Sequence, residues 1–151
     1  MNLIAFIMSI MLSWENVEEK YQTIVEADIF KILEFTIEDI ELMARVTMSE
    51  ASTEPYECKQ AVVQTLLNRY HSDKYPDTIV EIIDGQYSTK NNGEPTKECY
   101  DAVLWGITHP AIFPTDMYWF RNKHYHTFAH PYTQIGKTYF STATNYLEGE
   151  E

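Results

Sequence analysis

Spaced apolar residues predict three longer helices and one short helix in the central part of the chain. Thr36 followed by Asp39 is typical of a capping box, which would start the first helix at about residue 37. Pro55 disfavours helical dihedral angles at the residue before it, so this helix should end by 51–54. Further helices are expected over 56–71, from Asp77 or Thr78 to Ile83, and from Thr96 to Gly106, where the glycine would end the helix.

The pattern changes to β-prone residues in the C-terminal third of the chain. Strands are expected over 117–120, 132–135 and 138–140. The dipeptide Gly136-Lys137 suits a type II′ hairpin, because glycine is favoured at the first position of that turn. Helices that precede a small antiparallel sheet predict an α+β fold.

Residues 1–35 are expected to form an apolar and acidic helical segment apart from the main domain at 36–147. Residues 1–12 are an apolar run that is too short to span a bilayer, and no Lys or Arg precedes Lys20, as a secretory signal would require. We interpret the run as an amphipathic or packing segment, with an atypical export signal as the alternative. The acidic stretch 13–35 suits an appendage, a linker helix, or a surface for a partner or for self-association.

Charge and cysteine content exclude several functions. The net charge of −12 argues against nucleic acid binding, because affinity for phosphates comes from Lys and Arg. Most of this charge lies before residue 42 and after residue 147, so the body between them is nearly neutral. Cys58 and Cys99 are too few for a disulfide scaffold, and we expect two buried free thiols, with one disulfide as the alternative.

Glu50 is the candidate catalytic residue. It stands at the end of the first predicted helix beside Met48 and Ala51, and a carboxyl held against apolar groups keeps its proton to higher pH. Such a group can protonate a glycosidic oxygen near neutral pH, although a solvated surface glutamate is the alternative. Glycosidases usually need a second carboxylate, and none stands out in this sequence, which favours a mechanism with one carboxylate.

Aromatic residues and histidines gather between residues 118 and 140. Aromatic faces with nearby polar groups suit sugar rings, although half of these residues are expected to fill the sheet core instead. His124, His126 and His130 form a spacing that can ligate a metal. No Cys or carboxylate completes that set, so we favour polar groove or surface histidines and expect no cofactor.

Residues 42–70 resemble the opening block of the SleB/CwlJ-type cell wall hydrolases, the spore cortex-lytic family. The matching residues are Ala44, Arg45, Glu50, Ala51, Glu54, Pro55, Ala61, Val62, Leu67, Asn68 and Arg69. Similar blocks follow in the same order at 75–83, 86–88, 102–106 and 134–140.

This resemblance implies a lysozyme-like, lytic transglycosylase fold and cleavage of the glycan strands of peptidoglycan, which in spores form the cortex. It implies that Glu50 is the general acid and base, that Asn68 is a cap and that Arg69 pairs with a carboxylate. The remaining candidates, which would bind the glycan, are Glu54, Tyr87, Tyr118, Trp119, Tyr125, His126, Tyr132 and Gln134.

The chain departs from the family pattern at Cys58, Ser52-Thr53 and Trp105, where glycine, Arg-Gly and asparagine are usual. It also resembles the compact or phage-encoded members more than the two-domain spore enzymes. Action at the cell wall or spore cortex is expected, with the export route open. Two alternative functions remain: a catalytically silent wall-binding or assembly module, and a metal-dependent peptidoglycan hydrolase that uses the histidines.

Overall fold

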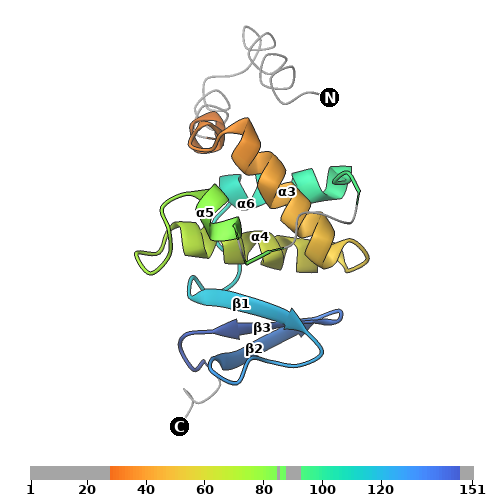
Figure 1. The fold of residues 1–151 in the computed structure, drawn as a ribbon, viewed down its shortest axis with the longest axis vertical. Helices are drawn as coiled ribbons and strands as arrows, with labels where there is room; N and C mark the ends of the chain where they lie inside the picture. Colours follow the sequence, from red (N-terminus) through yellow and green to blue (C-terminus); the bar gives the residue numbers. More distant parts are fainter. Residues whose placement is uncertain (1–27, 85, 88–92, 147–151) are drawn as a thin grey trace, which may run out of the picture.

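A computed structural model describes residues 28–84, 86–87 and 93–146. In these residues, helices α3 to α6 precede three strands, and the helices form a body that lies against the sheet (Figure 1). The α+β prediction is therefore confirmed. The elements are α3 (Ile37–Ala51), α4 (Tyr56–Tyr70), α5 (Ile79–Ile83), α6 (Lys97–Thr108), β1 (Met117–Asn122), β2 (His130–Ile135) and β3 (Thr138–Thr142).

Local capping signals set the starts of α3 and α5, as predicted. Thr36 Oγ1 accepts the backbone N–H of Asp39 at 3.0 Å, and the Asp39 carboxylate accepts the N–H of Thr36 at 2.9 Å. Thr78 Oγ1 likewise accepts the N–H of Glu81 at 3.2 Å at the start of α5. These bonds satisfy amide groups that have no partner inside the helix.

Gly106 lies inside α6 and does not end it, so that prediction was wrong. The helix continues to Thr108. A β-carbon on Gly106 would lie 2.8 Å from Val63 Cγ1 and 3.3 Å from Leu67 Cδ1, both on α4. Glycine is therefore used here for the close approach of two helices, a role that depends on residues some forty positions away in the sequence.

Helix α4 is the centre of the fold, since it packs against α3, α6 and β1. Ala61, Val62 and Leu66 on this helix are completely buried. Cys58 on α4 and Cys99 on α6 are both buried and free, which confirms the expectation of two free thiols.

The three strands form an antiparallel sheet in the order β1-β3-β2. Gly136 between β2 and β3 has a φ of +59°, whereas Lys137 is not among the described residues with positive φ. A type II′ turn needs positive φ at its first central residue only, so the predicted hairpin is confirmed.

Helical backbone also covers residues 28–33. Ile32 in this helix and Phe35, which follows it, are buried in the core. The rest of the predicted N-terminal segment, residues 1–27, lies outside the described residues. In the described part of the chain, we find no helix with the length and apolar character needed to cross a membrane.

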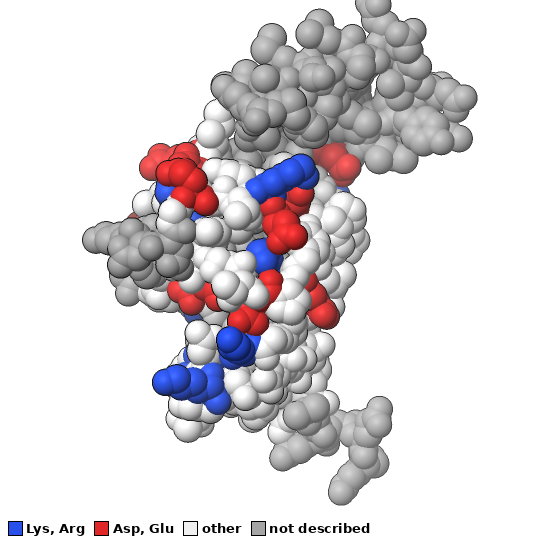
Figure 2. Space-filling model, turned by 90° about the vertical axis from the view of Figure 1, so that its right-hand side faces the viewer, with Lys and Arg blue, Asp and Glu red and all other residues white. Residues whose placement is uncertain are grey.

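Charged side chains are distributed unevenly between the helices and the sheet. The face shown in Figure 2 carries basic side chains at its lower, sheet end, whereas acidic and basic side chains lie together over the helical part. Residues 117–142 contain Arg121, Lys123 and Lys137 and no Asp or Glu. The sheet region is therefore the basic part of an otherwise acidic chain.

Candidate active site

Glu50 lies in the last turn of α3 and is half-buried. Burial raises the pKa of its carboxyl above the ordinary value for glutamate, as expected from its apolar neighbours. Ala51, the next residue and the last of the helix, is buried in the core. The arrangement supplies one carboxyl group that can hold a proton above the usual pH range.

Two other acids near the sheet are engaged in bonds to the backbone. Glu54 Oε2 accepts the N–H of Lys137 at 2.9 Å and so links the α3–α4 turn to the β2–β3 hairpin. Asp116 Oδ2 accepts the N–H of Thr144 at 2.8 Å, and its other oxygen accepts the Tyr146 hydroxyl at 2.9 Å. Both carboxylates hold loops in place, and Glu50 has no comparable bond in the described structure.

Asn68 and Arg69, at the end of α4, hold the beginning of β1. The Asn68 side-chain amide donates to the carbonyls of Pro114 at 2.9 Å and Met117 at 3.0 Å. Arg69 Nε donates to the carbonyl of Tyr118 at 2.8 Å. The expected roles, a cap and a carboxylate pair, were wrong. Both side chains are buried between α4 and β1, where strand carbonyls are the groups that need donors.

The same arginine also contacts the ring of Tyr87. The Arg69 guanidinium donates to the Gln86 side-chain oxygen and lies 5.2 Å from the centroid of the Tyr87 ring. The other ring contact is a stack on Phe120 at 5.7 Å. Burial raises the pKa of Tyr87 to about 12, and the nearby Glu50 charge adds to this shift. The support by Gln86 and Phe120 was not anticipated, although Gln86 lies in one of the resembling blocks.

Trp119 and His126 meet at the exposed ring of Phe128. The ring centroids of Trp119 and Phe128 are 5.5 Å apart, and those of His126 and Phe128 are 4.9 Å apart. Burial lowers the pKa of His126, which favours its neutral form. Tyr125 packs instead against Tyr139 on β3, at 5.0 Å between centroids. These residues form an aromatic surface around the β1–β2 loop.

Tyr132 and Gln134 lie on β2, which β3 separates from β1. The Tyr132 ring packs edge-on against Tyr146 at 6.1 Å, and Gln134 Nε2 donates to the carbonyl of Gly136 at 2.9 Å. The contacts described for these two candidates are with the segment after β3 and with the β2–β3 turn, and none of them reaches Glu50.

The three candidate metal ligands are distributed along the β1–β2 loop and the start of β2. His124 Nδ1 lies 2.9 Å from the carbonyl of Tyr125, His126 packs on Phe128, and His130 opens β2. Among the described residues, no three His, Cys, Asp or Glu side chains are grouped so that they could hold a metal ion. The three histidines are therefore not grouped as a metal centre in the described part of the chain.

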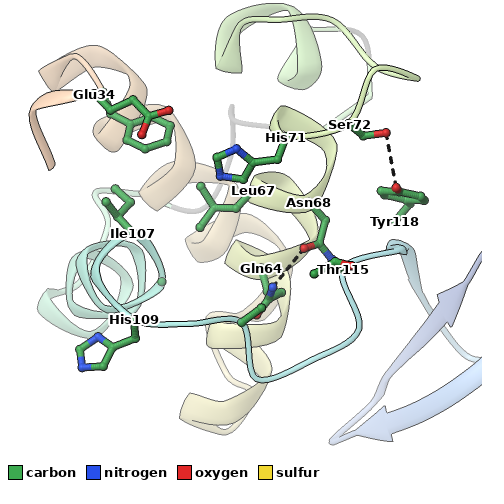
Figure 3. A pocket seen from close by; sticks show the side chains of 13 residues that line it. Glu34, Gln64, Leu67, Asn68, His71, Ser72, Ile107, His109, Thr115 and Tyr118 are labelled. Atoms are coloured by element: carbon green, nitrogen blue, oxygen red, sulfur yellow. Dashed lines mark hydrogen bonds between the residues drawn. The ribbon is translucent and has the colours of Figure 1, made fainter. Parts of the chain in front are cut away.

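A pocket of about 320 Å³ opens beside α4, near the end of α6 (Figure 3). Leu67 and Ile107 form apolar parts of its wall, and His71 and Glu34 add polar groups. Tyr118 lines it too, with its hydroxyl 3.4 Å from Ser72 Oγ, so this candidate faces the pocket. Glu50 is not among the lining residues, which separates the pocket from the candidate acid.

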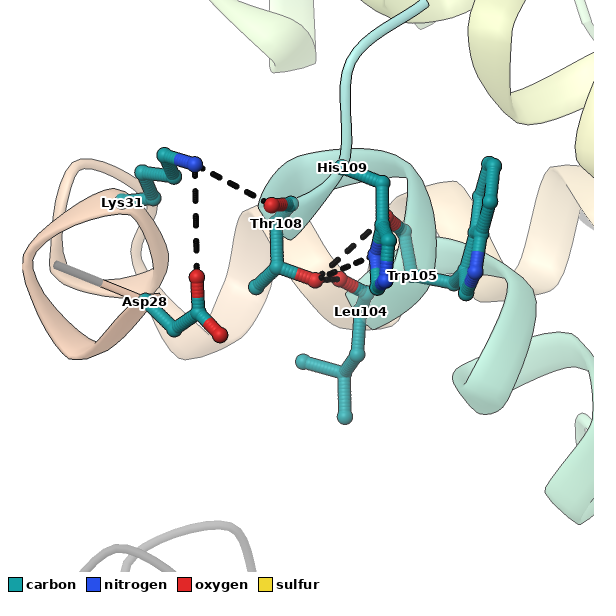
Figure 4. Close-up of polar contacts among 6 residues, drawn as sticks. All are labelled: Asp28, Lys31, Leu104, Trp105, Thr108 and His109. Atoms are coloured by element: carbon teal, nitrogen blue, oxygen red, sulfur yellow. Dashed lines mark hydrogen bonds and ion pairs between the residues drawn. The ribbon is translucent and has the colours of Figure 1, made fainter. Parts of the chain in front are cut away.

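The end of α6 beside this pocket is held by contacts shown in Figure 4. The Trp105 and His109 rings stack at 4.5 Å with an angle of 8° between their planes. Lys31 Nζ donates to the carbonyl of Thr108 at 3.1 Å and pairs with Asp28 at 4.0 Å. Trp105, one of the departures from the family pattern, therefore packs on the histidine that follows the helix.

Comparison with known proteins identifies relatives that are named as spore cortex-lytic enzymes. A region of the chain is 34% identical over 86 residues to a spore cortex-lytic enzyme of Oceanobacillus iheyensis, and covers 50% of this chain and 31% of that protein. A spore cortex-lytic enzyme of Bacillus subtilis is 29% identical over 90 residues, which cover 52% of this chain and 30% of that protein. The matched region thus spans about a third of each relative.

Solved structures share the fold. The catalytic domain of the Bacillus cereus SleB protein matches with a TM-score of 0.64 and 24% identity over 72% of this chain and 92% of that domain. The catalytic domain of the germination-specific lytic transglycosylase SleB from Bacillus anthracis matches with a TM-score of 0.62 and 22% identity, over 72% of this chain and 97% of that domain. This likeness confirms the predicted fold.

The model of the cell wall hydrolase family matches residues 53–141, more than half of the chain. These residues include α4, α5, α6 and the whole sheet. The match starts three residues after Glu50, so the role of that glutamate rests on its own geometry. The chain belongs to the cell wall hydrolase family.

Proposed function

We propose that this chain cleaves the glycan strands of peptidoglycan, with Glu50 as the general acid and then the general base. The observation that carries the proposal is the half-buried Glu50 carboxyl at the end of α3, whose pKa is raised by burial. A glutamic acid that keeps its proton towards neutral pH is suited to protonate a glycosidic oxygen.

The reaction that fits one carboxylate is lytic transglycosylation. Glu50 gives its proton to the scissile oxygen while the bond from that oxygen to C1 of the muramyl sugar breaks. The resulting Glu50 carboxylate then accepts the proton of the C6 hydroxyl of the same sugar, whose oxygen attacks C1. A 1,6-anhydro end forms, and Glu50 is protonated again. The engagement of Glu54 and Asp116 in backbone bonds supports this route, because neither is free to act as the second carboxylate.

The cell wall or the spore cortex is the proposed site of action, since the curated relatives are named as spore cortex-lytic enzymes. The sheet region with Arg121, Lys123 and Lys137 supports binding to an anionic wall. Trp119, Tyr125 and His126 would line the glycan groove near it. Partner binding or self-association through residues 1–35 stays a prediction.

We expect activity to fall as the pH rises through the raised pKa of Glu50, because the first step needs the protonated acid. The measurement is the release of soluble fragments from purified peptidoglycan over a range of about pH 4 to 9. A rate that increases through the same range would contradict Glu50 as the acid. Binding to peptidoglycan with no release of fragments would instead identify a silent wall-binding module.

A further inference from the structure

Three cationic side chains of the sheet region have no ion-pair partner in the described part of the chain. Arg121, Lys123 and Lys137 are all exposed, and none of them lies within ion-pair distance of a described acid. The ion pairs of the described residues instead involve cations of the helical part, which are Lys31, Arg45, Lys59 and Lys97. Exposed cations without a partner attract anions from outside the protein.

The strand register gathers these three cations at one end of the sheet. The last residue of β1 pairs with the first residue of β3. Lys123 and Lys137, the residues just beyond this pair, therefore lie at the same end, and Arg121 is one step further into the sheet, opposite Tyr139. Figure 2 shows basic side chains gathered at this end of the molecule. We call these three residues the basic sheet end.

Arg121 belongs to the face of the sheet that points away from the core. Phe140 on β3 is completely buried, and successive side chains of a strand point to opposite faces. The row formed by Arg121, Tyr139 and Gln134 therefore points outward. Arg121 and Gln134 are exposed, and the Tyr125 ring packs against Tyr139 at 5.0 Å. This outer face combines a guanidinium with tyrosine rings and an amide, which are groups that bind sugars and carboxylates.

The basic sheet end is joined to the turn that follows the helix of the candidate acid. The Lys137 N–H donates to the Glu54 carboxylate at 2.9 Å, and Glu54 lies in the turn between α3 and α4. Glu50 is in the last turn of α3, just before this turn. A polymer that is bound at the basic sheet end is therefore held on the side of the molecule where α3 ends.

We propose that the basic sheet end binds the carboxylates of the peptide stems of peptidoglycan and so holds the wall polymer on the protein during cleavage. This inference rests on the proposed function, because it takes the substrate named there. The stems carry the free carboxyl groups of this polymer, since the lactyl carboxyl of each substituted muramyl sugar is joined to its stem in an amide bond. The Arg121 guanidinium can bind a carboxylate through two parallel hydrogen bonds, and the two lysines add positive charge.

The test measures binding without cleavage, in the full chain carrying Glu50→Gln. The probe is insoluble peptidoglycan freed of teichoic acid, and sedimentation at low salt gives the Kd. The double variant Arg121→Gln with Lys123→Gln should raise the Kd about fivefold to twentyfold with an unchanged Tm, because both side chains are exposed. Lys74→Gln with Lys97→Gln is the matched control, since both lysines are exposed outside the sheet and the net charge changes equally. This control should keep the original Kd.

Amidation of the carboxyl groups of the peptidoglycan tests the identity of the partner. The chain with the intact basic sheet end and its double variant should bind amidated peptidoglycan equally weakly, because the carboxylates are gone. An unchanged Kd in the double variant, the same loss in the control, or a difference that persists on amidated peptidoglycan would overturn the proposal. Binding that appears only when teichoic acid is present would also overturn it, because phosphates would then be the ligand. The expected binding by a chain whose wild type releases no fragments would count against the proposed function alone.

Discussion

Glu50→Gln is expected to lower the release of soluble fragments from purified peptidoglycan by about 10²–10⁴-fold. Glutamine keeps the size and polarity of the side chain but has no proton to give to the glycosidic oxygen. Glu50 is half-buried at the end of α3, where its raised pKa keeps the carboxyl protonated towards neutral pH. The assay measures soluble sugar released per unit time at the optimal pH of the wild type.

Glu57→Gln is the matched control, because Glu57 is an exposed acid in the first turn of α4. It should retain wild-type activity. Folding should survive in Glu50→Gln, and its Tm at neutral pH should equal or exceed that of the wild type. Burial raises the pKa of Glu50, so the folded state loses stability as the pH rises through this pKa, and glutamine removes that loss. Wild-type rates in Glu50→Gln would refute the assignment.

Gly136→Ala is expected to destabilise the fold by about 2–4 kcal/mol. Gly136 has a φ of +59°, which strains any residue with a β-carbon. That β-carbon would also point directly into the Glu54 carboxylate and lie 3.1 Å from Pro55 Cδ. Glu54 would have to move and lose its bond to the Lys137 N–H, which joins the hairpin to the helices. Urea unfolding gives the free energy of unfolding for comparison with the wild type.

Gly93→Ala separates the two causes of this loss. Gly93 also has a positive φ, of +77°, but a β-carbon there would have no atom of the described residues within 4 Å. Its substitution should therefore cost about 1–2 kcal/mol through backbone strain alone. The double variant Gly136→Ala with Glu54→Ala should cost less than the sum of the two single variants, because the clash is gone. Additive losses would show that Glu54 and Gly136 do not interact.

Local sequence signals predicted several helix boundaries and the hairpin turn well. Thr36 and Asp39 act within one helical turn, Pro55 acts on its neighbour, and Gly136 fits its own turn, so each could be recognised from a few adjacent residues. Gly106 was misinterpreted because its role depends on Val63 of another helix. Contacts between elements distant in the sequence have no local signature.

In the candidate site too, features with a local sequence signal were predicted, and features that depend on tertiary packing were not. Glu50 could be proposed from its apolar neighbours and from the resembling block around it, and the structure agrees that burial raises its pKa. The bonds from Arg69 to the Tyr118 carbonyl and to Gln86 depend on tertiary packing, and sequence reasoning assigned Arg69 a carboxylate partner instead. The aromatic residues around Trp119 were predicted as a group, but which of them pack against one another depends on tertiary structure.

Mass spectrometry of the fragments released from purified peptidoglycan tests the single-carboxylate mechanism most directly. The wild type should produce 1,6-anhydromuramyl ends, which are one water lighter than reducing ends, and Glu50→Gln should produce neither kind of end above background. Reducing ends from the wild type, or anhydro ends from Glu50→Gln at the wild-type rate, would contradict cleavage by Glu50 acting alone as acid and base.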